Sequence, residues 1–136
     1  MNLDPERSRE RFEAARVARL ATVDAAAPHL VPVVFAVDGD TVVIAIDHKP
    51  KARRDVRRLA NIRANPAVSL LVDHYDEDWT TLWWVRVDGT AEVVEDPAAM
   101  AAPIDLLVAK YPQYREIRPA GPVIAVRIDR WRGWAA

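Results

Sequence analysis

The chain has 136 residues, 51% of them hydrophobic and 29% charged, and this balance is typical of one folded domain with a substantial core. The formal net charge is −1, there is no cysteine, and the three histidines lie far apart, so disulfides, thiolate catalysis and a metal site are not expected. No hydrophobic run approaches the ~20 residues that span a bilayer, and the charged N-terminus does not resemble a signal peptide, so we expect a cytoplasmic protein without a membrane partner.

The first part of the chain predicts a helix followed by short strands. Asp4 followed by Pro5 is typical of a helix start, and we expect this helix to run to about Arg16. Strands are expected at residues 18–24, 30–37 and 41–46. The last two are joined by a hairpin signal, Asp38-Gly39-Asp40.

The second part predicts longer strands around helical segments. Strands are expected at residues 67–73, 82–94 and 122–131. A helix should begin after Asp96-Pro97, be interrupted at Pro103 and resume over 104–110, with a short helix or loop at 111–118. Six strands with a few helices predict a mainly β fold, a small and mostly antiparallel β-barrel with peripheral helices, in one domain of residues 1–136.

Positive charge is concentrated between the third and fourth of these strands. Residues 49–63 hold seven of the 19 basic residues and one of the 20 acidic residues, which leaves 12 basic against 19 acidic residues elsewhere. A helix that starts near Pro50 would have an apolar stripe of Ala52, Val56, Leu59 and Ala60. Its opposite face would carry Arg54, Arg57, Arg58 and Asn61. Several cations beside a helix start favour a phosphate site, and the alternative is a solvated basic face.

Five tryptophans are the other unusual feature. Trp83 and Trp84 are neighbours in one predicted strand and must point to opposite faces, so one of them should meet a second subunit, a bound ring or a helix. Trp131, beside Arg130, could likewise stack on a ring. Because the sequence contains no nucleophile–base pair and no glycine-rich phosphate loop, we expect a cofactor to supply the chemistry.

The order of these motifs resembles a known family. Residues 57–73 read RRLANIRANPAVSLLVD, a basic helix that ends in N-x-x-x-N-P before an apolar strand, and DEDW at 76–79 and LWWVRVDG at 82–89 follow. This pattern resembles the pyridoxamine 5'-phosphate oxidase-like family of flavin- and deazaflavin-binding proteins, and within it the coenzyme F-420-dependent branch. The resemblance extends from residues 19–22 to Arg130-Trp131.

The resemblance implies a split β-barrel of the FMN-binding type that forms a homodimer with two cofactor sites in its interface. Arg57 and Arg58 would hold the cofactor phosphate, and Lys51 is a candidate to join or replace one of them. The ring would lie along the backbone of the second and third strands, at Val33, Val34, Ala45 and Ile46. The other subunit would contribute Trp79 or Trp83, together with the C-terminal strand at Trp131.

We therefore predict a dimeric oxidoreductase in which reduced coenzyme F-420 transfers hydride to a small organic substrate, with no side chain assigned a catalytic role. FMN is the alternative cofactor, and a cofactor-binding protein without turnover is the alternative class. Nucleic-acid binding is disfavoured, because the chain outside the basic helix is net negative and offers no broad basic surface.

Overall fold

Residues 1–25, 27–46 and 53–136 are described by the computed structural model, and they form helices and strands in a regular order. The helices are α1 (Pro5–Ala14), α2 (Arg53–Ala64), the 3-10 helix η1 (Trp79–Thr81), α3 (Pro97–Lys110) and α4 (Pro112–Glu116). The strands are β1 (Ala18–Val23), β2 (Pro28–Val33), β3 (Ala36–Asp38), β4 (Thr41–Ala45), β5 (Ala67–His74), β6 (Trp83–Val94) and β7 (Val123–Ala135). Side-chain oxygens of Asp4, Asp78 and Asp96 cap the starts of α1, η1 and α3.

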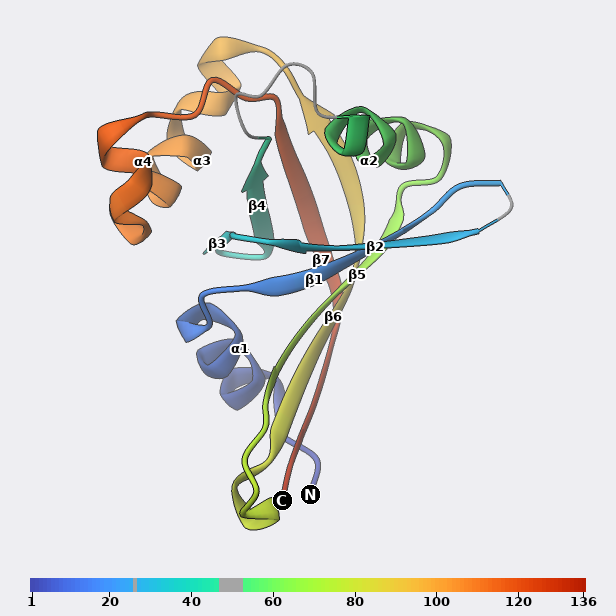
Figure 1. Cartoon of the computed structure of the whole chain (residues 1–136), viewed down its shortest axis with the longest axis vertical. Coiled ribbons are helices and arrows are strands. Elements are labelled where there is room, and N and C mark those ends of the chain that lie inside the picture. The colour runs from blue at the N-terminus through green and yellow to red at the C-terminus, as the bar shows by residue number, and fades with distance from the viewer. Residues whose placement is uncertain (26, 47–52) are drawn as a thin grey trace.

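The described strands form one seven-stranded antiparallel sheet in the order β2-β1-β5-β6-β7-β4-β3. β2 and β3 lie at opposite ends of this order, yet only Val34 and Phe35 separate them along the chain. The sheet must therefore curl until its two edges meet, and Figure 1 shows β2 and β3 running end to end. β5, β6 and β7 continue beyond the curl to a tip near both chain termini. The expected mainly β barrel with peripheral helices is confirmed.

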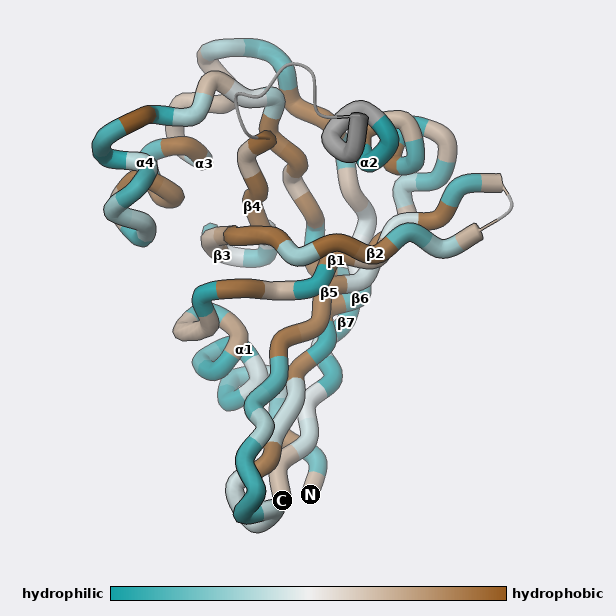
Figure 2. The backbone as a smooth tube through the Cα atoms, viewed as in Figure 1, coloured by the Kyte–Doolittle hydropathy of each residue, from teal (hydrophilic) through white to brown (hydrophobic). Residues whose placement is uncertain are grey.

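Two groups of buried side chains hold this arrangement together. The larger group lies inside the curl, and its largest members are Phe12, Leu20, Phe35, Ile44, Leu70 and Ile124. The smaller group packs α3 against β3 and β4 through Ile104, Leu107 and Tyr111. Figure 2 shows hydrophobic positions dense on β3 and β4 and hydrophilic ones frequent toward the tip. None of the helices in the described part of the chain is long and apolar enough to span a membrane.

The single strand predicted at residues 30–37 is wrong, since β2 and β3 are separate strands. The chain leaves one edge of the sheet and joins the other at Phe35, whose side chain is fully buried. The Phe35 N–H donates to the hydroxyl of Tyr111 at 3.2 Å, and the same hydroxyl lies 3.0 Å from the Phe35 carbonyl oxygen. A tyrosine distant in sequence thus satisfies the backbone where the sheet ladder does not.

Two predicted boundaries also differ from the structure. α3 continues through Pro103, although a proline there cannot donate to the carbonyl four residues earlier. The burial of Ile104 and Leu107 against the sheet offsets this loss. β7 runs to Ala135, beyond the end expected at residue 131, and its last residues pair with the start of β6.

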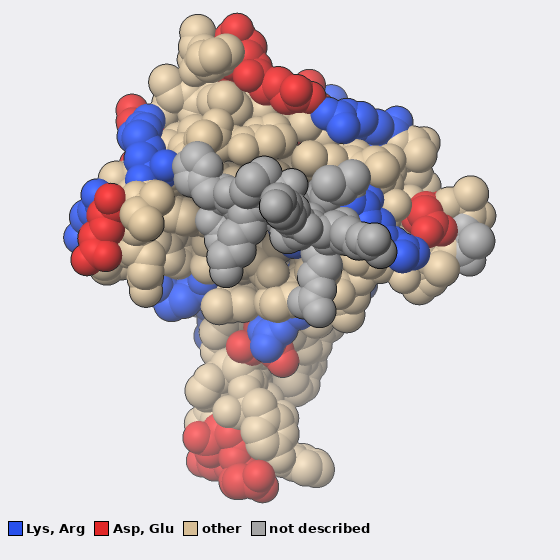
Figure 3. Space-filling model, turned by 45° about the horizontal axis from the view of Figure 1, so that its top comes forward, with Lys and Arg blue, Asp and Glu red and all other residues tan. Residues whose placement is uncertain are grey.

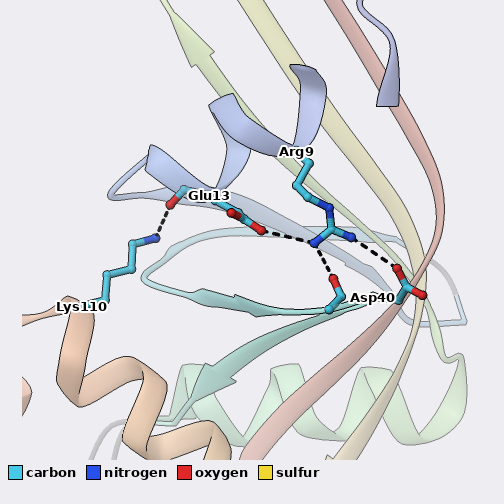
Figure 4. A network of polar contacts seen from close by, with 5 residues as sticks. Arg9, Glu13, Asp40 and Lys110 are labelled. Atoms are coloured by element: carbon cyan, nitrogen blue, oxygen red, sulfur yellow. Dashed lines mark hydrogen bonds and ion pairs between the residues drawn. The ribbon is translucent and has the colours of Figure 1, made fainter. Parts of the chain in front are cut away.

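α1 is tied to two other parts of the fold (Figure 4). Arg9 donates to the carboxylate of Glu13 at 3.2 Å and to the carbonyl of Gly39 at 2.6 Å, and it lies 3.3 Å from the carboxylate of Asp40. Lys110, at the end of α3, donates to the backbone carbonyl of Glu13 at 3.1 Å. The end of α1 is therefore held between the β3–β4 turn and α3.

Candidate functional site

Helix α2 carries the arginines predicted to bind a phosphate, and it lies against the end of β1. Arg57 forms an ion pair with Asp24, with 3.1 Å between Nη2 and Oδ2, while much of its side chain stays exposed. Arg58, the next residue, is half-buried. The amide of Asn61 donates to the hydroxyl of Thr22 at 3.1 Å, and both side chains are buried. The helix is thus anchored by polar contacts at Arg57 and Asn61.

The predicted orientation of α2 is wrong at Ala60 and Asn61, while Leu59 packs on the core and Arg57 is exposed as expected. Asn61 and Ile62 are buried, with 4% and 2% exposure, whereas Ala60 is exposed. The inward face therefore includes an amide that the helical pattern assigned to the outer face, because Thr22 offers that amide a buried partner. Lys51 and Ala52 lie outside the described residues, as do the side chains of Arg54 and Val56.

The four positions predicted to line the cofactor ring lie at the ends of β2 and β4. Val33 ends β2 and Val34 follows it, while Ala45 ends β4 and Ile46 follows it. The side chains of Val33, Ala45 and Ile46 are buried and that of Val34 is half-buried, so these positions can offer mainly their backbone. The Ile46 N–H already donates to the carbonyl of Pro122 at 2.9 Å. The end of β4 lies at the same end of the molecule as α2 (Figure 1).

The tryptophans predicted to reach the cofactor lie in two different environments. Trp79, in η1 at the tip, is 67% exposed. Trp131 packs on α1, with its ring centroid 5.6 Å from that of Phe12 and 5.5 Å from the guanidinium of Arg9. The ring of Trp83 lies 5.4 Å below the guanidinium of Arg11, on the same helix. Trp83 and Trp131 are therefore packed against α1 of the same chain.

Of the neighbouring pair Trp83 and Trp84, it is Trp84 that the structure exposes, although the family resemblance pointed to Trp83. Trp84 points to the outer face of the sheet, is 36% exposed and stands opposite Trp134 in the β6–β7 register. The alternation of buried and exposed residues along β6 predicts which tryptophan points outward, since Val85 and Val87 are buried. Trp83 shares their inward side and Trp84 takes the outward side.

A cavity of 760 Å³, here called the outer-face cavity, opens on the outer side of β1, β5 and β6. Its apolar walls include Leu30, Leu71, Trp84 and Trp134. Leu30, Leu71 and Trp84 are large side chains exposed to solvent in this chain. Exposed apolar side chains gathered around one hollow mark a surface for binding or association.

Charged groups border this cavity. Asp88 accepts hydrogen bonds from the hydroxyl of Ser69 at 2.8 Å and from Nε of Arg86 at 2.9 Å. Partial burial works to raise the pKa of Asp88, but these bonds and the charges of Arg86 and Arg130 outweigh it and hold the pKa below its ordinary value. Arg132 stands directly opposite Arg86 in the sheet. Asp88 neutralises part of this positive charge, and the remainder suits a negatively charged ligand group.

Helix α2 and the exposed Trp84 do not meet within one chain. Ile62 and Arg63 of α2 line a hollow together with Ala91 near the end of β6, whereas Trp84 stands near the start of that strand. The strand between Trp84 and Ala91 spans roughly 23 Å. Figure 3 shows acidic side chains gathered at the tip of the molecule, far from the end where α2 lies.

Comparison with known proteins identifies the class to which this barrel belongs. A family model described as pyridoxamine 5'-phosphate oxidase matches residues 4–135. The chain therefore belongs to the pyridoxamine 5'-phosphate oxidase family, as its motifs indicated. None of the curated proteins compared with the chain matches it.

Solved structures share the fold at low sequence identity. A FAD-binding protein from Mesorhizobium loti is 22% identical with a TM-score of 0.75, and the match covers 98% of this chain and 95% of that one. A conserved hypothetical protein from Mycobacterium tuberculosis is 23% identical with a TM-score of 0.76, over 98% and 85% of the two chains. A heme storage protein from Vibrio cholerae is 20% identical with a TM-score of 0.68, over 99% and 95%. The split-barrel fold is thus confirmed, and it occurs with more than one ligand.

Proposed function

We propose that this chain is a coenzyme F-420-dependent oxidoreductase that works as a homodimer and transfers hydride from the reduced deazaflavin to a small organic substrate. Membership of the pyridoxamine 5'-phosphate oxidase family supports a redox role, and the FAD-binding neighbour supports a flavin-type cofactor. The observation that carries the proposal is the outer-face cavity, a large apolar hollow walled by Trp84 and bordered by arginines. FMN is the alternative cofactor.

The residues present fit such a cofactor. A phosphate is bound best by charge-assisted donors, and Arg57 and Arg58 are two guanidinium groups on one helix. A planar ring system needs apolar and aromatic walls, which the outer-face cavity offers at Leu71 and Trp84. When bound, the deazaflavin supplies the hydride, and the side chains bind and orient the reactants.

Two copies of the chain are needed to complete each site in this proposal. Arg57 and Arg58 of one subunit bind the phosphate, and the backbone at Ala45 supports the ring. The outer-face cavity of the second copy closes over the ring, with the partner subunit's Trp84 against it. The separation of α2 from Trp84 within one chain supports this sharing.

Charge favours the deazaflavin over FMN. Coenzyme F-420 carries an anionic tail beyond its phosphate, whereas FMN ends at the phosphate. The basic segment 49–63 holds seven cations, which is more than one phosphate requires. Arg132 adds positive charge opposite Arg86, a cavity-lining residue that is itself paired with Asp88. These surplus cations should attract the longer anion through interactions that salt weakens.

Absorbance titration of the purified protein with coenzyme F-420 and with FMN tests the proposal. We expect F-420 to bind more tightly at low ionic strength and the preference to narrow as salt rises. Equal affinities, or a preference for FMN at low salt, would refute the deazaflavin assignment. Tight retention of reduced F-420 without transfer to any acceptor would favour the non-catalytic cofactor-binding alternative.

A further inference from the structure

A second cavity, of 530 Å³, lies between the end of α1 and strands β1, β5 and β6, and is here called the α1 cleft. Arginines and aromatic rings dominate its polar lining, namely Arg11, Arg16, Arg19, His74 and Trp83. Its acidic lining residues are Glu10 and Asp73. With three guanidinium groups against two carboxylates, the cleft is positive in a chain whose formal net charge is −1.

Arg11 is the cation best placed to bind a ligand in the α1 cleft. Arg19 is paired with Asp73 at 3.3 Å, and Arg16 donates to a backbone carbonyl at the end of α3 at 2.8 Å. Arg11 instead lies over the ring of Trp83, 5.4 Å from its centroid. No carboxylate is paired with Arg11 in the part of the chain that the structure describes. A guanidinium held by an aromatic face keeps its N–H donors available for an oxyanion.

Two nearly parallel aromatic rings stand beside Arg11. His74 and Trp83 are opposite one another in the β5–β6 register, with ring centroids 6.3 Å apart and planes inclined by 17°. His74 is exposed, Trp83 is half-buried, and both rings line the cleft. A planar ligand can stack there, whereas a puckered one of similar size makes poorer contact.

The α1 cleft adjoins the outer-face cavity. The two hollows share four lining residues, Arg19, Asp73, His74 and Trp83. A molecule in the α1 cleft would therefore be a neighbour of whatever occupies the outer-face cavity. In the proposed dimer that occupant is the cofactor bound to the other subunit.

We propose that the α1 cleft is the substrate site and that the substrate is a planar molecule bearing a carboxylate. Arg11 binds the carboxylate through two parallel N–H donors, and the planar part lies against Trp83 and His74. This inference deepens the proposed function and rests on it for the reaction, whereas the binding site itself can be tested without any cofactor.

NMR titration of the full chain with benzoate, benzamide and cyclohexanecarboxylate tests the site. Compared with benzoate, benzamide lacks the negative charge but keeps the planar ring. Cyclohexanecarboxylate keeps the negative charge but has a puckered ring. We expect benzoate to bind about tenfold more tightly than either. In the Arg11→Gln variant, benzoate should bind no more tightly than benzamide. In the Arg11→Lys variant, part of the tighter binding of benzoate should remain. Arg7→Gln, on the exposed part of α1 outside the cleft, is the matched control and should change nothing.

Trp83→Leu provides a second variant that tests the aromatic surface. We expect it to make benzoate and cyclohexanecarboxylate bind alike. Equal binding of benzoate and benzamide to the wild type, or benzoate binding unchanged by Arg11→Gln, would overturn the site. Failure of the F-420 titration with benzoate binding intact would refute the proposed function alone. F-420 binding without selective benzoate binding would refute the substrate class alone.

Discussion

At the residue scale, Lys110 shows how burial and a neighbouring charge lower the pKa of one side chain. Its ammonium group donates to the backbone carbonyls of Glu13 and Ala15 at 3.1 and 2.8 Å, and it lies 4.0 Å from the ring centroid of Phe35. Burial, followed by the charge of Arg16, lowers the pKa of Lys110 from 10.5 to about 8, against the opposing charge of Glu13. The folded chain therefore releases this proton more easily than the unfolded chain.

The lowered pKa of Lys110 predicts that its contribution to stability rises with pH. Between the folded pKa of about 8 and the unfolded value of 10.5, the unfolded chain keeps a proton that the folded chain has lost. Denaturant unfolding at about pH 7.5 and about pH 9.5 should show the wild type gaining about 1 kcal/mol relative to Lys110→Met, a value discounted for the partial exposure of the amine. A difference between the two proteins that stays constant or falls with pH would contradict the lowered pKa.

At the scale of elements, α2 is docked through a buried polar pair, and this makes its stability sensitive to a single amide. Asn61→Leu would leave the buried Thr22 hydroxyl without its hydrogen bond. We expect the free energy of unfolding to fall by about 1–3 kcal/mol, measured by denaturant titration. The double variant Asn61→Leu/Thr22→Val removes both polar groups and should lose less than the single variant. Full stability of Asn61→Leu would show that the pair does not anchor the helix.

The same helix is predicted to capture the cofactor phosphate. Arg58→Ala should weaken binding of coenzyme F-420 by about tenfold or more, because a charge-assisted hydrogen bond to phosphate contributes about 1.5–3 kcal/mol. Arg63→Ala is the control, since Arg63 lies in the last turn of α2, beyond the proposed phosphate ligands, where it is paired with Glu95. Fluorescence titration with F-420 measures both variants. An unchanged affinity after Arg57→Ala/Arg58→Ala would move the phosphate site away from α2.

The sequence predicts well those helices and strands whose formation depends on residues close by in the chain. Asp4-Pro5 and Asp96-Pro97 mark helix starts through caps made within the first turn, and the alternation of β6 reflects the burial of Val85 and Val87. The errors have distant causes. The break at Phe35 depends on Tyr111, and the inward turn of Asn61 depends on Thr22.

The candidate site follows the same division: the sequence predicts the residues that belong to a short motif and misses those brought together by distant elements. Family motifs indicate Arg57 and Arg58, and both lie on α2. Choosing Trp84 over Trp83 needed the position of α1, which covers the inward side of β6 with Arg11. The α1 cleft joins residues from α1, β1, β5 and β6, so no short sequence pattern contains it.

At the scale of the whole molecule, the outer face of the sheet predicts association. Leu30 is 67% exposed and Trp84 36% exposed in a single chain, and both line the same hollow. Sedimentation at micromolar concentration should therefore give about twice the chain mass of 15.3 kDa. Leu30→Glu places a charge in this face and should shift the protein toward monomers. A monomeric wild-type protein would refute the proposed cofactor site shared between two subunits.

The central claim is that one subunit's α2 and the partner subunit's outer face together bind coenzyme F-420. The most direct measurement mixes two defective proteins, Arg57→Ala/Arg58→Ala in one subunit and Trp84→Ala in the other, with different tags so that mixed dimers can be isolated. Each parent should bind F-420 weakly, because both of its sites are damaged. A mixed dimer has one site carrying both defects and one intact site, so it should bind about half as much F-420 as the wild type, with wild-type affinity. Mixed dimers that bind no better than their parents would contradict the shared site.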